Sequence, residues 1–359
     1  MTRPAEVVVN LSALRHNFSR IRSLAPDSQI MAIVKADAYG HGIARIAQAL
    51  EQADAFGVAC LEEARELRQA NIKQRINLLE GPYAREELSE ISDLGLDIVV
   101  HDISQLEMLE QTQLNKPVDV WLKIDTGMHR LGFSPELVNE VVRRLQQSKC
   151  VKDIRMMTHL ASANERKNPM VSEQINCFSQ SSEGMNVEIS IANSAGIMAF
   201  PDTHVDWVRP GIMLYGVSPF NDSHGPQEGL KPVMTLRSKL ITVKQLKAGD
   251  PVGYGATWRC PEDMPVGVVA AGYGDGYPRH AKSGTPVIVN GERVDLIGRA
   301  SMDMLTVDLR NQPQAKSGDP VILWGEGLPV EEVANHAETI PYEVLCAVHK
   351  RLKFSYGEV

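Results

Sequence analysis

Short apolar runs alternate with longer amphipathic stretches between residue 30 and about residue 210. Such runs predict buried strands, and apolar positions that recur every third or fourth residue predict helices packed over them. The expected strands lie at 30–34, 55–60, 75–80, 96–100, 118–124, 154–158, 187–191 and 205–208. The expected helices lie at 43–53, 61–70, 84–93, 103–114, 135–147, 171–183 and 195–199. This alternation predicts a (β/α)8 barrel, and an open doubly wound sheet is the alternative.

The pattern changes after about residue 228, where Val, Ile, Thr and Leu cluster between Gly, Pro, Asn and Asp. This pattern is typical of strands joined by tight turns, and Asn290-Gly291 predicts a two-residue hairpin turn. The runs lie at 233–243, 266–271, 286–289, 294–297, 304–309 and 320–324. The sequence therefore predicts an α/β protein with an N-terminal (β/α)8 barrel over residues 1–228 and a C-terminal all-β domain over residues 229–359. Residues 6–10 are strand-like and are a candidate strand of the second domain.

The composition of the 359-residue chain fits a globular protein, with 43% hydrophobic and 23% charged residues. Its 37 basic and 45 acidic residues give a net charge of −8 without a basic block, so neither nucleic acid nor an anionic membrane is an expected partner. No signal peptide or membrane span is apparent. The cysteines are scattered and form no CxxC pair: Cys60, Cys150, Cys177, Cys260 and Cys346. We expect free thiols in the cytoplasm, with Cys60 buried, and neither a disulfide framework nor a metal site.

Polar residues follow several of the expected barrel strands. In a (β/α)8 barrel the loops after the strands converge on one face, so residues at successive strand ends become neighbours. These positions hold Lys35, Tyr39, Lys123, Arg130, His159, Asn193, Ser194, Arg209, Gly211 and Ile212. We predict that they form one polar site at the mouth of the barrel.

The first of these positions, Lys35, ends an apolar run. It is suited to be a Schiff-base amine, although a lysine that reaches solvent from a strand end fits equally well. Ser194 and the backbone of Gly211 and Ile212 fit a phosphate at a helix start, but Ser194 is also a candidate helix cap at the start of 195–199.

The remaining charges leave alternatives open. Arg209 keeps its charge and needs an acceptor, either a barrel carboxylate or a ring nitrogen or phosphate of a ligand. Lys123 lies near a second cation, so Asp125 on the same strand face is a candidate partner, and carbamylation of Lys123 would reverse its charge. Tyr254 and Tyr273 lie in glycine-flanked turns and are either exposed turn residues or groups directed at another domain's site.

Taken in order, these motifs resemble the alanine racemase family, whose members are fold-type III enzymes that use pyridoxal phosphate (PLP). The resemblance extends over essentially the whole chain. It is carried by VKADAYGHG (34–42), KIDTGMHRLG (123–132), THLASA (158–163), IANSA (191–195), RPGIMLYG (209–216), GYGATW (253–258), ASMD (300–303) and PYEVLC (341–346).

The resemblance implies interconversion of L- and D-alanine, for peptidoglycan or for alanine catabolism. Lys35 would form the Schiff base with PLP and act as the base for the D-enantiomer, and Tyr254 would act on the L-enantiomer. Lys123 would be carbamylated and would orient Arg130. The implied substrate contacts are Arg130, Met302 and Asp303, and the implied cofactor contacts are Lys35, Tyr39, His159, Asn193, Ser194, Arg209, Gly211, Ile212 and Tyr342.

The resemblance also implies a homodimer in which Tyr254, Tyr273 and Met302 complete the partner's site. The implied entrance residues are Asn164, Tyr273, Arg279 and Arg299. Some family members carry an acidic residue where Asn164 stands, so the charge of the entrance differs here.

Three other functions compete with this interpretation. A non-catalytic PLP-binding protein shares a similar barrel but has no β domain. A fold-type III decarboxylase for basic amino acids typically places an acidic residue at the ring nitrogen, where this chain has Arg209. A racemase of broader specificity is the closest alternative, because motifs do not define pocket volume.

Overall fold

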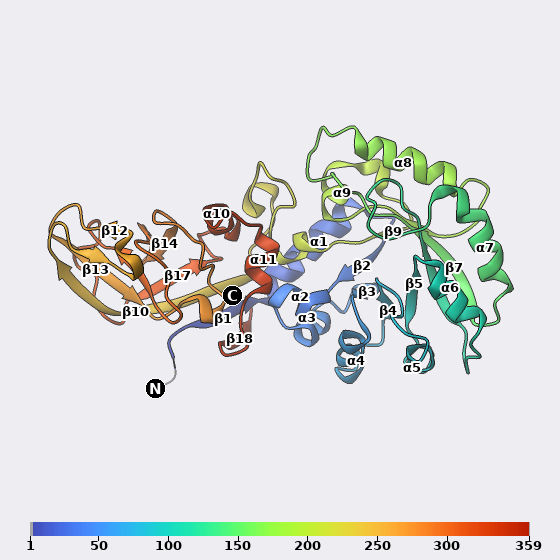
Figure 1. Cartoon of the computed structure of the whole chain (residues 1–359), viewed down its shortest axis with the longest axis horizontal. Coiled ribbons are helices and arrows are strands. Elements are labelled where there is room, and N and C mark those ends of the chain that lie inside the picture. Colours follow the sequence, from blue (N-terminus) through green and yellow to red (C-terminus); the bar gives the residue numbers. More distant parts are fainter. Residues whose placement is uncertain (1–2, 359) are drawn as a thin grey trace.

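The computed structural model describes residues 3–358 and consists of a barrel beside a β-rich part (Figure 1). The barrel is a closed parallel ring in which each strand pairs with the next along the chain and β9 pairs with β2. Its strands are β2 (Gln29–Ile33), β3 (Ala55–Val58), β4 (Arg75–Leu78), β5 (Asp97–Val100), β6 (Val118–Lys123), β7 (Val151–Met157), β8 (Ile189–Ser190) and β9 (Trp207–Val208). The predicted (β/α)8 barrel is confirmed, and the alternative of an open sheet is wrong.

Helices cover the outside of the barrel, because each buries an apolar face against the strands. They are α1 (Leu11–Leu24), α3 (Ile43–Ala49), α4 (Leu61–Gln69), α5 (Glu87–Asp93), α6 (Ile103–Glu110), α7 (Val138–Gln147), α8 (Met170–Ser181) and α9 (Ser194–Ala199). The short element α2 (Lys35–Gly40) lies instead between the end of β2 and α3. Several end earlier than predicted, as α3 and α6 do. The fully buried rings of Trp121 and Trp207 meet edge to face, with centroids 5.6 Å apart.

The C-terminal sheet has the strand order β15-β14-β17-β10-β1-β18, and β13 pairs with β10 and β16. Its strands are β1 (Glu6–Asn10), β10 (Met234–Leu246), β13 (Met264–Val269), β14 (Pro286–Val289), β15 (Glu292–Asp295), β16 (Leu305–Asp308), β17 (Pro320–Trp324) and β18 (Lys353–Gly357). A separate small pair joins β11 (Pro251–Val252) to β12 (Trp258–Arg259). Asn290 and Gly291 join β14 to β15 with φ of 50° and 86°, the positive values that a type I′ hairpin requires.

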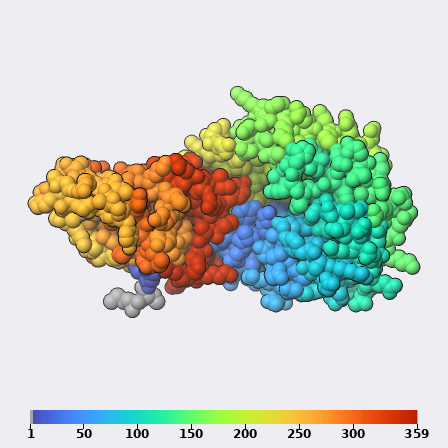
Figure 2. All heavy atoms as spheres, viewed as in Figure 1, coloured from blue at the N-terminus to red at the C-terminus, as the bar shows by residue number. Residues whose placement is uncertain are grey.

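Strand β1 pairs antiparallel with β10 and parallel with β18, so the chain begins in the C-terminal sheet and enters the barrel through α1. The prediction of an all-β second domain misses two short helices, α10 (Val330–His336) and α11 (Pro341–Cys346). Helix α11 lies against α2, and in Figure 2 the red C-terminal segments lie directly against the blue part of the barrel. A boundary at residues 228/229 stays a prediction.

Two further observations bear on expectations from composition. Within residues 3–358, no helix is long and apolar enough to cross a membrane, and no cluster of three or more His, Cys, Asp or Glu suits a metal. The cysteines are free, but Cys60 is only partly buried. The expectation of a fully buried Cys60 is wrong, because this residue lies in the loop that leads into α4, beyond the end of β3.

Candidate active site

The carboxyl ends of the barrel strands surround a cavity of about 770 Å³. Residues that are distant in the sequence meet here, because each follows a different strand of the ring. Of the residues expected in the site, those that line the cavity are Lys35, Tyr39, Lys123, Arg130, His159, Asn164, Asn193, Ser194, Arg209, Gly211, Ile212 and Tyr342. Tyr342 comes from α11, so the C-terminal segment also contributes to the lining.

The other expected residues belong to the β-rich part and do not line this cavity. They are Tyr254, Tyr273, Arg279, Arg299, Met302 and Asp303. Tyr254 is 71% exposed and Met302 is 53% exposed, so their side chains face outward from this chain. A single chain therefore brings together the cofactor-side residues but not the second expected base.

Lys35 reaches the cavity from an unusual backbone turn. Residues 36–39, which form most of α2, have φ of 53–54° and ψ of 42–51°, the left-handed helical region. This conformation is unfavourable for L-residues, so neighbouring groups must hold it. The N–H of Ala36 donates to Glu63 Oε1 over 2.7 Å, and Asp37 Oδ1 accepts from the N–H of Ile43 over 2.8 Å.

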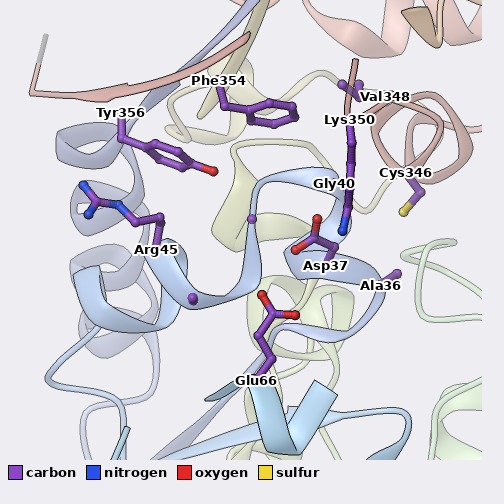
Figure 3. A pocket seen from close by; sticks show the side chains of 12 residues that line it. Ala36, Asp37, Gly40, Arg45, Glu66, Cys346, Val348, Lys350, Phe354 and Tyr356 are labelled. Atoms are coloured by element: carbon purple, nitrogen blue, oxygen red, sulfur yellow. The ribbon is translucent and has the colours of Figure 1, made fainter. Parts of the chain in front are cut away.

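The outer side of the same turn borders a second hollow of about 650 Å³, shown in Figure 3. Asp37, Glu66 and Lys350 line this hollow, and Ala36 and Cys346 border both cavities. None of the residues expected in the site lines the second hollow. The barrel cavity is therefore the candidate active site.

Arg209 is a fully buried cation at this site. Its guanidinium donates to the hydroxyl of Ser190 and to the carbonyl oxygens of Thr158 and Ile191. The alternative of an ion pair with a barrel carboxylate is wrong, since no carboxylate lies within 4 Å among the described residues. Burial lowers the pKa of Arg209 to about 10, so it stays charged at neutral pH.

Further cations surround Arg209 in the lining. Burial, with Arg209, Arg130 and Lys35 nearby, lowers the pKa of Lys123 to about 8. The same effects lower the pKa of His159 well below its usual value, so its ring is neutral at pH 7. Glu80 is the only carboxylate among the described lining residues. The cavity is thus strongly positive and suits an anionic ligand.

Asp125 does not neutralise Lys123, contrary to one of the two alternatives. Its Oδ1 accepts from the N–H groups of Gly127 and His129 over 3.0 Å, and its Oδ2 lies 3.2 Å from His129 Nδ1. These bonds shape the loop that leads to Arg130. Asp125 is therefore a loop-forming residue.

Ser194 is not the helix cap that the sequence suggested. The side chain of Asn193 caps α9 by accepting from the N–H of Gly196 over 3.0 Å. Ser194 Oγ instead accepts from the N–H groups of Gly211 over 2.9 Å and Met213 over 3.4 Å. Its hydroxyl hydrogen is thus directed away from these donors and is available to an anion.

Two phenols complete this end of the cavity. Burial raises the pKa of Tyr342 to about 12, and burial together with Tyr342 raises the pKa of Tyr39 further. Both hydroxyls stay protonated and are able to donate. A Cβ on Gly211 would lie 2.7 Å from the Tyr39 hydroxyl, so only glycine allows this approach. Hydroxyl donors and cations, with Glu80 as the only carboxylate among the described lining residues, fit a phosphate group.

Sequence reasoning missed Glu80, which lines the cavity, and two residues that support its lining, Ser190 and Tyr215. Glu80 ends the expected strand 75–80, and Ser190 lies near the end of the expected strand 187–191. Lys35 was selected because it follows the end of a strand, and the same criterion would have selected these two residues. Tyr215 was missed as well, although its hydroxyl donates to the carbonyl of Ile33 over 2.9 Å at the end of β2. No local pattern indicates that bond.

Comparisons with known proteins agree with this geometry. The family "Alanine racemase, N-terminal domain" matches residues 9–219, and "Alanine racemase, C-terminal domain" matches residues 233–356. The alanine racemase of Nitrosococcus oceani is 54% identical over 351 residues, which cover 97% of this chain and 98% of that protein.

Solved structures give the same result. The biosynthetic alanine racemase of Pseudomonas aeruginosa has a TM-score of 0.97 and 44% identity, over 99% of this chain and 100% of that one. The alanine racemase of Bartonella henselae, described with covalently bound pyridoxal phosphate, has a TM-score of 0.90 and 30% identity over 99% of both chains. Because both domains match, the alternatives of a barrel-only PLP-binding protein and of a decarboxylase are set aside. The chain belongs to the alanine racemase family of PLP-dependent isomerases.

Proposed function

We propose that this chain interconverts L- and D-alanine, using PLP attached to Lys35 and two bases on opposite sides of the substrate. The observation that carries the proposal is the position of Lys35 in a cavity whose lining holds four cations and one carboxylate. PLP, when bound, supplies an electron sink that stabilises negative charge on the substrate carbon.

The residues present fit this cofactor. Tyr39, Tyr342 and Ser194 are the proposed hydroxyl donors for its phosphate. The backbone N–H of Ile212 is a further proposed donor, and Gly211, whose own N–H donates to Ser194 Oγ, is proposed to contact the phosphate through the space that its missing side chain leaves. His159 and Asn193 line the same cavity and are proposed cofactor contacts. Arg209 is proposed to face the ring nitrogen. A permanent cation there disfavours protonation of that nitrogen, which limits side reactions that need a stronger sink.

Arg130 is the proposed contact for the substrate carboxylate, and Lys123 is proposed to carry a carbamate that orients it. Carbamylation requires the neutral amine, which attacks carbon dioxide and releases a proton. With a pKa of about 8, about a tenth of Lys123 is neutral at pH 7. The charge reversal would offset part of the positive excess of the cavity. Intact-mass analysis under native conditions at neutral pH should show one added carboxyl group in the wild-type protein and none in Lys123→Arg, and no such difference would reject this modification.

The second base is proposed to be Tyr254 from another copy of the chain. Tyr254, Tyr273 and Met302 are large, partly apolar and exposed, which is typical of a surface that another chain covers. In this role the Tyr254 phenolate accepts the proton from the L-enantiomer, and the cations of the cavity would stabilise its negative charge. Met302 and Asp303 are then the proposed substrate contacts, and Asn164, Tyr273, Arg279 and Arg299 the proposed entrance.

The test uses mixed dimers of two inactive variants, Lys35→Ala and Tyr254→Phe. In a mixed dimer one site has an intact lysine from one subunit and an intact tyrosine from the other. Random pairing should therefore restore about a quarter of the wild-type rate of D-alanine formation from L-alanine. No recovery on mixing would reject the shared site, and wild-type protein that racemises serine, lysine or arginine as fast as alanine would favour the broader specificity. The cytoplasmic location and the physiological role stay predictions.

A further inference from the structure

A buried carboxylate lies in the β-rich part of the molecule, outside the cavity. Asp275 is fully buried, and Arg3 and Arg351 both contact it. Arg3 Nη2 donates to Oδ2 over 2.7 Å, and Arg351 Nε donates to Oδ1 over 2.8 Å. The N–H of Gly272 also donates to Oδ2, over 2.9 Å. A buried charge needs such partners, so Asp275 joins both ends of the chain to the turn at 272–276.

The same two arginines also hold a second loop, residues 301–303. Arg351 Nη2 donates to Asp303 Oδ1 over 2.8 Å and lies 3.4 Å from the carbonyl oxygen of Met302. Arg3 Nη2 donates to the carbonyl of Asp303 over 2.8 Å. Each guanidinium therefore bridges the buried carboxylate and the loop, as its planar fork of donors allows.

The two loops also bond directly to one another. The N–H of Tyr273 donates to the carbonyl of Ser301 over 3.0 Å, and the N–H of Gly274 donates to that of Met302 over 2.8 Å. A Cβ on Gly272 would lie 2.3 Å from the Ser301 carbonyl oxygen, so the backbones are in close contact. The loops form one unit whose outer side presents Tyr273 and Met302, which are 37% and 53% exposed.

We propose that Asp275, Arg3 and Arg351 are positioning residues that hold Tyr273 and Met302 in the arrangement required by the cavity of the partner subunit. The proposal rests on the proposed function, in which these two side chains complete the other copy's site. Charge-assisted bonds from two guanidinium forks to a buried carboxylate are stronger than ordinary surface pairs.

The main variant is Arg351→Met, which removes one of the two guanidinium bridges between the loops but leaves Asp275 paired with Arg3. The matched control is Arg293→Met, since Arg293 makes a two-bonded ion pair with Glu332 in the same part of the molecule, 2.7 and 2.9 Å long. A displacement of about 1 Å costs on the order of 100-fold in rate. We expect kcat/KM for alanine to fall about 10- to 100-fold in Arg351→Met, mainly through KM, and to stay unchanged in the control.

Readouts other than activity separate positioning from general damage. Cofactor content, dimer formation and melting temperature of Arg351→Met should match those of Arg293→Met. Hydrogen exchange should accelerate at residues 272–276 and 301–303 and not in the barrel. Arg351→Lys keeps the charge but lacks the fork, so it should fall between wild type and Arg351→Met, and it serves as the test if the methionine variant does not fold.

Mixed dimers of Lys35→Ala and Arg351→Met identify the subunit that is affected. In such a dimer, the only site with an intact Lys35 lies in the Arg351→Met subunit. This site receives its loops from the Lys35→Ala subunit, in which Arg351 is intact, so its kcat/KM should equal that of wild type. A reduced value in this site would overturn the proposal, as would unchanged kcat/KM or unchanged exchange in Arg351→Met itself. Failure of the proposed function would show itself separately, because mixing Lys35→Ala with Tyr254→Phe would then restore no racemase activity.

Discussion

Replacing Ala36 by glycine should stabilise the protein, which is the opposite of the usual effect. Ala36 has φ of 54° and ψ of 51°, in the left-handed region. An L-residue there costs roughly 1–2 kcal/mol, because its Cβ crowds the following carbonyl. Glycine avoids this cost but adds roughly 0.5–1 kcal/mol through the greater freedom of the unfolded chain. The difference predicts a net stabilisation of about 0.5–1 kcal/mol for Ala36→Gly.

The matched control is Ala44→Gly in α3, a right-handed helix that follows the turn. Only the unfolded-state effect operates there, so this variant should lose about 0.5–1 kcal/mol. Both should be compared with wild type by thermal and urea unfolding of the holoprotein, at equal protein and PLP concentrations because ligand and subunit binding shift apparent stability. The decisive result is the sign of the change in the free energy of unfolding, which should be a gain in Ala36→Gly and a loss in Ala44→Gly. Equal losses in both variants would show that the turn stores no strain, and the account of how Lys35 is presented would fail.

Three further predictions follow from buried groups. Burial lowers the pKa of His41 from 6.5 to about 4, so between these pH values the unfolded state binds one more proton than the folded state. The free energy of unfolding should therefore fall by about 3 kcal/mol as the pH drops through this window. The variant His41→Phe should show a shallower slope of melting temperature against pH. In Gly40→Ala, at φ of 78°, the new Cβ would lie 2.3 Å from the Leu345 carbonyl oxygen, which should lower the free energy of unfolding by more than ~3 kcal/mol. In the control Gly95→Ala, at φ of 60°, the new Cβ meets open space, so the same unfolding assays should show a loss of only ~1–2 kcal/mol. Ser194→Ala removes the hydroxyl proposed to donate to the phosphate and should weaken PLP binding by about 1–3 kcal/mol in equilibrium titration, without loss of the α9 cap, which Asn193 provides.

The barrel was predictable because its signal is repeated and local. Each strand is a short apolar run, each helix has a long apolar face, and eight repetitions outweigh an error at any one boundary. Helices α10 and α11 were missed because helices of seven and six residues are too short to show a period. The misassigned cap at α9 has a similar origin, since a helix start placed one residue late makes Ser194 look like the cap in place of Asn193.

The left-handed turn was not predictable, because nothing local favours it. Residues 36–39 are Ala, Asp, Ala and Tyr, and none is the glycine that such φ values normally require. The conformation is imposed by groups distant in the sequence, including Glu63 and the α11 backbone at Leu345. The glycine-flanked turn left Tyr254 as either an exposed residue or a group directed at another domain's site, and spacing alone gave no reason to assign Met302 to a barrel site. Their expected roles came from the resemblance to a family, and the single chain leaves them exposed.

The last segment of the chain connects the two halves of the proposed site. Leu345 of α11 lies against Gly40, and the hydroxyl of Tyr356 in β18 donates to the carbonyl of His41 over 3.1 Å, so both contact the left-handed turn that presents Lys35. Between them lies Arg351, which holds the loops proposed to complete the partner's cavity. A shift of this segment would therefore displace both the turn that presents Lys35 and the loops that are proposed to complete the partner's cavity.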